Sequence, residues 1–278
     1  MLYSTPVQTK DFTFDLNINL SRNVSKVKEL ADGVDYLFFN GDANFPINVG
    51  TRVGHRLGEI YAKNLYKRDE NGNMIVNKQG RPTKVSGEDA FQYTLDHPIG
   101  NIEPDLLMSV SPSFTYKGFT LSALFDMKFG GDIVSVSEAM ATSTGLAART
   151  ANRGNAENGW KIVAPGVTAD GTVNSTAMNA QRYYTSMSGM AEEFVYDASF
   201  IKLKELSLGY SFPKSILKKT PLTSLNVAFV ARNLAYLMKH TPGTSPEGGY
   251  DTSMFSQAID YMSVPYTRTF GLSINLGF

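Results

Sequence analysis

LLMSVSPSFTYKGFTLSALFDMKF, residues 106–129, is the stretch that decides the fold. Apolar and polar side chains alternate along its two halves, and only Leu107 interrupts the polar side of the first half. The halves meet at Tyr116-Lys117-Gly118, which predicts a tight turn. Because successive side chains of a strand point to opposite faces, each half is predicted to form a strand with one apolar and one polar face.

The same two-residue period recurs along the rest of the chain. It is found in three further segments, more loosely in the second of them: 12–21, 225–229 and 269–278. Within 199–212 the apolar positions change phase at Lys204-Glu205, which predicts a β-bulge. Another segment, 48–66, is β-like but less regular, and no long amphipathic helix is visible. We therefore predict an all-β chain.

Two settings produce long strands with one apolar face. In a soluble sandwich that face is buried, and strands are commonly about 5–6 residues long. In a membrane barrel it faces lipid, the polar face lines a wet lumen, and about 9–11 residues cross the bilayer. Here the alternation is long, and Ser, Thr, Asn and Gly dominate the polar positions instead of Lys and Glu. The pattern favours the barrel, and the sandwich is the alternative.

The connections between the predicted strands differ in length. Short ones are predicted at 116–118 and 213–224, and long ones at 131–193 and 238–263. Short turns on one side of the membrane and long loops on the other are typical of outer-membrane barrels. The connection at 24–49 is too long for a short turn, and the pattern does not explain it.

Composition excludes several classes of protein. The chain has 278 residues, with 26 Lys and Arg against 26 Asp and Glu, so the basic excess of a nucleic-acid binder is missing. It has no Cys, which excludes disulfides and thiolate metal sites. No run approaches the ~18 apolar residues of a membrane-spanning helix. The first residues lack a basic region followed by an apolar one, so they do not read as a signal peptide.

Candidates for catalysis or metal binding are sparse. His55, His97 and His240 lie far apart, and the sequence lacks phosphate-loop, dinucleotide-binding and nucleophile-elbow motifs. DENGN at 69–73 lacks the spacing of a calcium loop and predicts a hairpin turn. We predict no catalytic residues, no metal site and no cofactor, so the chain is not expected to be an enzyme.

Five landmarks carry a family resemblance. In order and in approximate spacing they resemble those of the SusC/RagA family of TonB-linked outer-membrane transporters: IGNIEPD (99–105), GGDI (130–133), ASFIKLKELSLGYSFP (198–213), ARNL (231–234) and PYTRTFGLSINLGF (265–278). Each is weakly specific alone, but five in the right order are specific, and the resemblance covers residues 16–278. The sequence departs from the family at 244–247, where Ser245 stands in place of an Asp, and in having Trp160 as the sole Trp of its long loop. These departures leave the substrate open.

The resemblance implies a bacterial outer-membrane protein. Relatives form a barrel of about 22 strands around an N-terminal plug, whereas this chain shows strands for only part of one. We therefore expect residues 1–278 to be the C-terminal part of such a barrel, without signal peptide, TonB box or plug. The fold expected is an antiparallel up-and-down segment of a transmembrane β-barrel, an open, curved sheet of about seven to nine strands with long extracellular loops.

The resemblance also implies function and partners. Relatives import nutrients, oligosaccharides or peptides, into the periplasm together with a SusD-like surface lipoprotein. The expected partners are outer-membrane lipid, that lipoprotein, the TonB complex acting through the missing plug, and the barrel-assembly machinery; nucleic acid is not expected.

Two groups of candidate site residues follow. The aromatic residues of the long loops are candidates for stacking on substrate, with loop packing or contact with the lipoprotein as the other interpretation: Trp160, Tyr183, Tyr184 and Tyr250. The closing strand ends on an aromatic residue with apolar residues at every second position before it, which resembles the signal read by the barrel-assembly machinery: Phe270, Leu272, Ile274, Leu276 and Phe278.

Two other functions remain open at this stage. One is a soluble or surface-attached β-sandwich adhesin, and the other is an enzyme embedded in a small complete barrel. The discriminating observation is geometric. If the alternating apolar side chains share one convex, uncovered face, the barrel interpretation holds; if they pack against a second sheet, the sandwich does.

Overall fold

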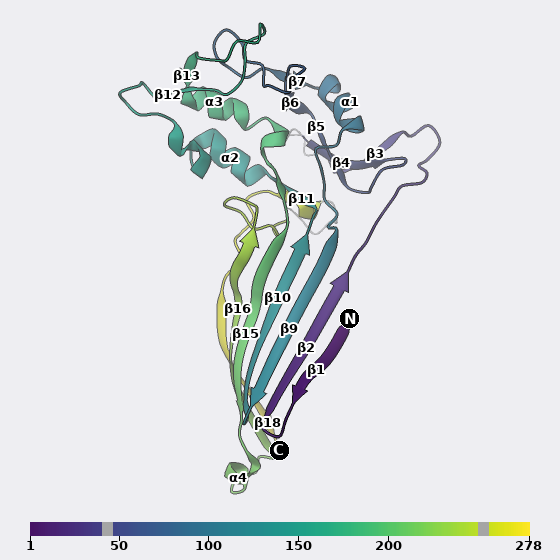
Figure 1. Cartoon of the computed structure of the whole chain (residues 1–278), viewed down its shortest axis with the longest axis vertical. Coiled ribbons are helices and arrows are strands. Elements are labelled where there is room, and N and C mark those ends of the chain that lie inside the picture. Colours follow the sequence, from purple (N-terminus) through teal and green to yellow (C-terminus); the bar gives the residue numbers. More distant parts are fainter. Residues whose placement is uncertain (41–46, 250–255) are drawn as a thin grey trace.

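The computed structural model describes residues 1–40, 47–249 and 256–278, which form two parts that we call the stem and the head (Figure 1). The stem is one long sheet. Its seven strands are β1 (Leu2–Gln8), β2 (Phe12–Ser21), β9 (Leu106–Tyr116), β10 (Phe119–Phe129), β15 (Phe200–Ser211), β16 (Ser224–Lys239) and β18 (Thr269–Gly277).

The stem is an up-and-down antiparallel sheet in the order β1-β2-β9-β10-β15-β16-β18. Short turns join its strands at one end, the last of them containing α4 (Lys214–Leu217). At the other end the connections are long, cover 22–105, 130–199 and 240–268, and build the head (Figure 1). The connection at 24–49 is thus the start of a head segment, which explains its length.

Segment 48–66 forms strands as predicted, although they are not stem strands, and one stem strand was missed. Segment 48–66 belongs to the head, where its strands are only three to six residues long and mostly buried. β1 supplies the stem strand in its place. Its alternation is obscured by Pro6 and by a shift of register between Ser4 and Val7. A bulge displaces side chains from the regular two-residue period, which explains why the sequence pattern did not reveal it.

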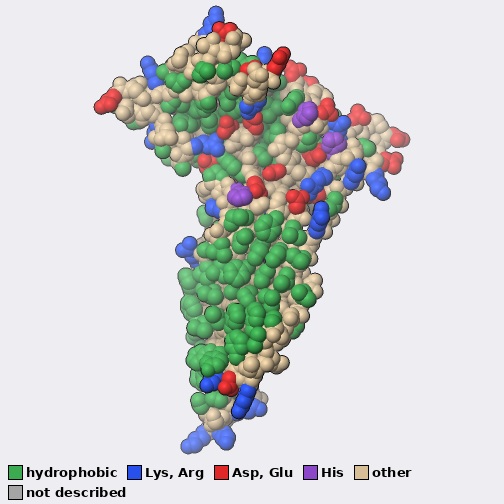
Figure 2. Space-filling view, viewed as in Figure 1, with side chains coloured by type: hydrophobic (Ala, Val, Ile, Leu, Met, Phe, Trp, Pro, Cys, Tyr) green, Lys and Arg blue, Asp and Glu red, His purple; other side chains and the backbone are tan. Residues whose placement is uncertain are grey.

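The apolar side chains share one face of the stem. Residues paired across neighbouring strands lie on the same face, and one such row runs across six strands: Phe14, Phe114, Leu121, Leu208, Phe229 and Leu272. From Phe114 onward each of them is exposed. Figure 2 shows an apolar surface over the face of the stem that is in view. We call the apolar face that carries this row the apolar belt. Among the described residues, no second sheet packs on the apolar belt. The sandwich interpretation is therefore wrong.

An aromatic row borders the apolar belt at the end with the short turns. Phe12 pairs with Tyr116, Tyr116 with Phe119 and Phe119 with Tyr210, one from each of four neighbouring strands. The ring centroids of Phe119 and Tyr210 lie 4.5 Å apart. Aromatic girdles at the edge of an apolar band are typical of outer-membrane barrels, where such rings lie at the membrane–water interface.

The predicted bulge is confirmed. Leu124 of β10 pairs with Glu205, whereas the next residue, Phe125, pairs with Leu203, so Lys204 has no partner in the register. The extra residue shifts the phase of β15. Because of it, Leu203 before the bulge and Leu206 after it both lie on the apolar face although they are three positions apart.

The head contains short strands and helices. Its strands are β3 (Tyr36–Asn40), β4 (Ile47–Arg52), β5 (Glu59–Ala62), β6 (Asn64–Tyr66), β7 (Lys84–Ser86), β8 (Gly100–Asn101), β11 (Asp132–Ser135), β12 (Lys161–Val163), β13 (Ala177–Asn179), β14 (Val195–Asp197) and β17 (Ile259–Asp260). Its helices are α1 (Glu88–Asp96), α2 (Val136–Thr144) and α3 (Ala180–Met187), with 3-10 turns η1 (Ala148–Asn152), η2 (Ala191–Glu193) and η3 (Ser256–Ala258). None of the described helices is long and apolar enough to cross a membrane.

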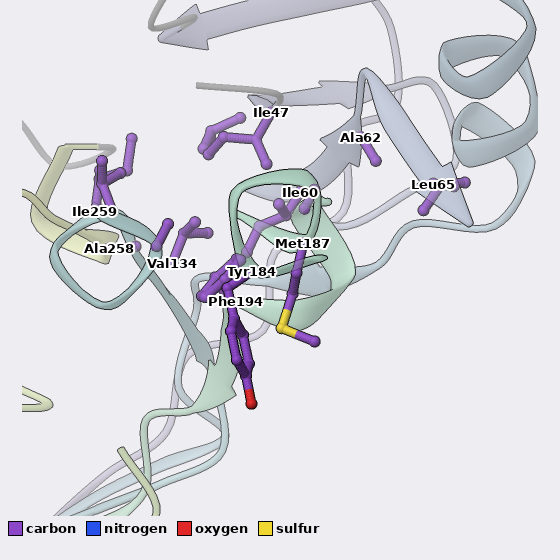
Figure 3. Close-up of a cluster of buried hydrophobic side chains, with 14 of the residues drawn as sticks. Ile47, Ile60, Ala62, Leu65, Val134, Tyr184, Met187, Phe194, Ala258 and Ile259 are labelled. Carbon is purple, nitrogen blue, oxygen red and sulfur yellow. The ribbon is translucent and has the colours of Figure 1, made fainter. Parts of the chain in front are cut away.

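The main buried core of the chain lies in the head and not in the stem. All three long connections contribute to it, as shown by Ile47 from the first, Val134 and Phe194 from the second and Ile259 from the third (Figure 3). All four side chains are almost completely buried. The chain therefore buries apolar side chains in its head and exposes them along its stem, opposite to what two equally water-soluble parts would do.

Candidate functional site at the junction of stem and head

Three of the sequence landmarks meet where the chain passes between stem and head. The N–H of Gly130 donates to Oγ of Ser199 at 2.8 Å, and the N–H of Ala198 donates to the carbonyl oxygen of Gly131 at 2.9 Å. Gly130 has a φ of 72°, and a Cβ placed there would collide with the carboxylate of Asp105. The landmarks are therefore the residues that fix the geometry of this junction.

Two acidic side chains extend the junction into the head. The carboxylate of Asp132 accepts the Asn101 N–H at 2.8 Å; burial raises the pKa of Asp132, and this hydrogen bond opposes the rise only in part. Asp197 accepts the Ser199 N–H at 2.8 Å and pairs with Nδ1 of His240 at 2.5 Å. Partial burial works to raise the pKa of Asp197, but the hydrogen bonds from Ser199 and His240 outweigh it and hold the pKa below its ordinary value.

Replacing Gly130 by Ala should destabilise the junction by about 2 kcal/mol, because the side chain would meet Asp105 in a backbone conformation that L-residues avoid. The free energy of unfolding in urea measures the loss. Gly171→Ala is the matched control, since Gly171 has a φ of 84° but open space around it, and should cost about 1 kcal/mol from the backbone alone. Equal losses for the two variants would show that packing against Asp105 contributes nothing.

The polar face of the stem carries ion pairs. Nζ of Lys204 lies 2.5 Å from the Asp126 carboxylate, and Nε of Arg232 lies 2.8 Å from that of Glu205. Asp126 pairs across the sheet with Lys202 and Glu205 with Arg232. These charges lie on the face opposite the apolar belt, as expected for side chains that line a wet lumen.

A buried lysine lies at the head end of this polar face. Nζ of Lys202 is 4.8 Å from the ring centroid of Tyr266 and 5.1 Å from that of Tyr236, and 2.5 Å from a Glu247 carboxylate oxygen. Only 4% of the Lys202 side chain is exposed. The cation–π contacts and the ion pair together offset the free-energy cost of removing the ammonium group from water. We call this group the lysine clamp, and it fastens the last head segment to β15.

The lysine clamp explains the departure at Ser245. Its Oγ accepts the Glu247 N–H at 3.2 Å, and the Tyr236 hydroxyl lies 2.7 Å from it. A side-chain oxygen that accepts the N–H two residues later forms the same type of turn as an Asp would form. Ser245 can therefore hold Glu247 in place without the Asp that is common in the family.

Of the predicted substrate-contact residues that the structure describes, Trp160 and Tyr184 line one hollow and Tyr183 does not. Tyr183 and Tyr184 are buried on α3, and the Tyr184 hydroxyl donates to the carbonyl oxygen of Arg149 at 3.1 Å. Burial raises the pKa of Tyr183 to about 12. Packing within the head accounts for the Tyr183 ring, whereas Tyr184 also lines the hollow beside Trp160. Trp160 is 50% exposed and remains a candidate, and Tyr250 lies outside the described residues.

Sequence reasoning missed the ion pairs that fasten α2 and η1 to the rest of the head. Nη1 of Arg149 lies 3.0 Å from the Glu193 carboxylate, and Nη2 donates to the Tyr196 hydroxyl at 2.8 Å. The guanidinium also lies over the ring of Phe194, 5.0 Å from its centroid. These residues are 44 or more positions from Arg149, so no local spacing signals them.

Arg149→Lys should loosen this part of the head by about 1–2 kcal/mol, because an ammonium cannot replace the guanidinium fork. Hydrogen exchange of backbone amides in 136–196 should accelerate accordingly. Arg182→Lys is the control because its side chain is exposed, and it should stay within about 0.5 kcal/mol. The interpretation fails if the two variants exchange equally fast.

The closing strand lies at an edge of the stem. β18 pairs with β16 alone among the described strands. Its alternating apolar side chains are all exposed: Phe270, Leu272, Ile274, Leu276 and, next to the strand, Phe278. They continue the apolar belt to the end of the sheet, and their predicted role in barrel assembly stays a prediction.

Comparisons with known proteins agree with this architecture. The chain matches no protein-family model. It is 27% identical to TonB-dependent receptor P3 of Formosa agariphila and 26% identical to TonB-dependent receptor SusC of Bacteroides thetaiotaomicron, over 99% and 98% of its length. It spans only 28% and 25% of these two receptors.

Solved structures show the same fold. The RagAB peptide importer in its open-open state matches with a TM-score of 0.63 and 20% identity, over 99% of this chain and 28% of that one. Its closed-closed state matches with the same TM-score and 17% identity. The match covers both the stem and the head of this chain. Over nearly its whole length the chain is a homologue of TonB-dependent receptors of the SusC/RagA type and has the fold of their outer-membrane β-barrel.

Proposed function

We propose that residues 1–278 form the C-terminal part of a TonB-dependent importer that carries nutrient oligosaccharides or peptides across the outer membrane. The observation that carries the proposal is the apolar belt with its polar reverse face. Exposed apolar strands of this length are stable in lipid, whereas in water they would be a site of aggregation. A surface adhesin would need this face covered, and among the described residues no second sheet covers it.

The arrangement of stem and head also indicates which partners the chain would need. The edges at β1 and β18 would continue into the remaining strands of a barrel, since open edges do not occur in the lipid core. Energy would come from the TonB complex acting on a plug that such a barrel encloses. A SusD-like lipoprotein would lie over the head, which is the part built by the long connections.

Uptake and location test the proposal together. The protein, as encoded in its host, should sediment with the outer membrane, and uptake of labelled oligosaccharides or peptides should stop when TonB is deleted. Deleting a SusD-like lipoprotein of the same host should lower uptake as well if it is the proposed partner. Recovery of the protein in the soluble fraction, or equal uptake without TonB, would contradict the proposed function.

Phe278→Ser should lower the amount of protein in the outer membrane several-fold, because the assembly machinery would lose the terminal aromatic ring that it is proposed to read. Quantitative blotting of membrane fractions measures the effect. Phe278→Tyr keeps an aromatic ring and should restore the level. If the Ser variant assembles normally, the closing strand is not the signal.

A further inference from the structure

We propose that the head carries a groove that binds an acidic oligosaccharide, one bearing carboxylate or sulfate groups. The inference rests on the proposed function and narrows its substrate class. Two hollows open beside the start of α3, with volumes of about 380 and 690 Å³. Asn179 and Gln181 line both of them, so the two hollows form one groove across the first turn of the helix.

The groove is lined by cations without acidic side chains. Arg153 lies in the smaller hollow and Arg81 and Arg182 in the larger one, and neither hollow is lined by Asp or Glu. Nη1 of Arg153 donates to a backbone carbonyl at 2.7 Å, and Nε of Arg81 to Oγ of Ser186 at 3.2 Å. None of the three pairs with a carboxylate within the described part of the chain. In a chain of zero net charge, three such arginines along one groove predict an anionic ligand.

The neutral side chains of the groove present hydrogen-bond donors. Oδ1 of Asn77 accepts the N–H groups of Gln79 and Arg81, both at 3.0 Å, and Oδ1 of Asn179 accepts the N–H of Arg182 at 3.1 Å. Because both amide oxygens are occupied by backbone, the NH₂ groups are the part left to face a ligand. Donors of this kind match the hydroxyl, carboxylate and sulfate oxygens of a sugar.

One buried hydroxyl has no partner. Thr142 is 0% exposed and lines the smaller hollow, and its Oγ1 makes no hydrogen bond to any residue that the structure describes. Leaving a buried hydroxyl unpaired costs free energy, so native proteins rarely do so unless a bound group completes it. Because the hydroxyl has no exposed surface, a ligand in the hollow could pair with it only after the wall of the hollow opens.

Trp160 supplies an aromatic surface at the same hollow. Its φ of 56° is unusual for a residue with a side chain. Two hydrogen bonds hold it there: its carbonyl accepts the Ala180 N–H at 2.9 Å and its N–H donates to Asn155 at 2.8 Å. Strained positions of this kind cluster at binding sites. A fixed, half-exposed indole beside donors and cations is suited to the face of a sugar ring. An acidic peptide could pair with the same arginines, but it has no flat ring face to stack on the indole.

The fluorescence of Trp160 provides a direct test, because it is the sole Trp of the sequence. The probes are an oligogalacturonate hexamer, a sulfated carrageenan hexamer, neutral maltohexaose and hexaglutamate. At least one acidic sugar should change the emission and bind about ten-fold more tightly than maltohexaose, with an affinity that falls as salt is added. The carboxylated and sulfated probes identify which anion the groove prefers.

Matched variants separate binding from folding. Arg182→Gln and Trp160→Ala should each weaken binding of the preferred sugar about ten-fold, measured by calorimetry for the Trp variant. Thr142→Val should not destabilise the fold, because the hydroxyl that it removes has no hydrogen bond to lose among the described residues. Arg22→Gln, the same charge change at an exposed residue outside the groove, and Tyr93→Ala, an exposed ring on α1, should leave it unchanged.

Three outcomes would overturn the proposal that the groove binds an acidic oligosaccharide. They are equal affinity for maltohexaose, equal affinity for hexaglutamate, and binding that is indifferent to Arg182→Gln and Trp160→Ala. TonB-dependent uptake, measured in the same cells, distinguishes this failure from failure of the proposed function. If uptake persists while acidic sugars do not bind, the groove is wrong and the importer stands; if acidic sugars bind but TonB-dependent uptake is missing, the importer is wrong.

Discussion

Replacing Glu247 by Gln should destabilise the attachment of the last head segment to the stem by about 3 kcal/mol. Removing one partner of a buried ion pair costs about 3–5 kcal/mol, because the remaining charge stays desolvated. Lys202 is the buried partner, and the side chain of Glu247 keeps 20% of its surface exposed, which places the expected cost at the lower end. The cation–π contacts of Tyr236 and Tyr266 remain but cannot neutralise the ammonium.

The measurement is the free energy of unfolding in urea, together with proteolysis of segment 240–268. Glu205→Gln is the matched control. It removes a carboxylate from β15, the strand that carries Lys202. Its partner Arg232 is 63% exposed, so the loss should stay below about 1 kcal/mol. The double variant Lys202→Met/Glu247→Gln should recover much of the stability. If Glu247→Gln and Glu205→Gln cost the same, Lys202 is not a buried charge.

Leu206→Arg should be comparably damaging, with a cost of about 2–4 kcal/mol near the middle of the membrane. Leu206 lies near the middle of β15, on the apolar face, paired with Ala123 and Ala231. A guanidinium at that depth would have to leave water for hydrocarbon. The penalty would fall on insertion as well as on stability, so the folded fraction recovered from membranes should drop.

Ser207→Arg is the control for Leu206→Arg. Ser207 is the next residue on the same strand and pairs with Ser122 on the polar face. An arginine there would point to the wet side and should cost less than about 1 kcal/mol. Heat-modifiable migration in electrophoresis and urea titration in liposomes report both variants. The lipid-facing assignment is wrong if Leu206→Arg is tolerated as well as Ser207→Arg.

The stem could be predicted from the alternation of apolar and polar residues. Side chains of a strand repeat every two residues, and a strand in contact with lipid needs an apolar face along its whole length. The strands of 106–129, the closing strand and the bulge at Lys204 were predicted for this reason and are confirmed. Where a strand is short or buried on both faces, that signal disappears. The strands within 48–66 gave only an irregular pattern on this account, and Pro6 together with a shifted register concealed β1.

The site was less predictable because it depends on contacts between distant residues. Lys202 and Glu247 are 45 positions apart, and only the folded sheet brings them together. The aromatic candidates show the same limit. Tyr183 and Tyr184 lie in a helix whose packing buries them, whereas Trp160 lies in a turn that exposes it, and composition alone does not separate these cases. The resemblance identified the junction residues but not their geometry.

The head draws its core from all three long connections, and this has a consequence for biogenesis. The core needs Ile47, Val134 and Ile259 to meet, and each lies in a different connection. They can meet only when the stem strands that flank these connections are side by side and in register. A slip of one residue between two neighbouring strands would offset their loops by about 3.3 Å and reverse the faces of one strand. We therefore expect the head to pack fully only over a correctly aligned sheet, so that a misaligned barrel would expose its loops to surface proteases.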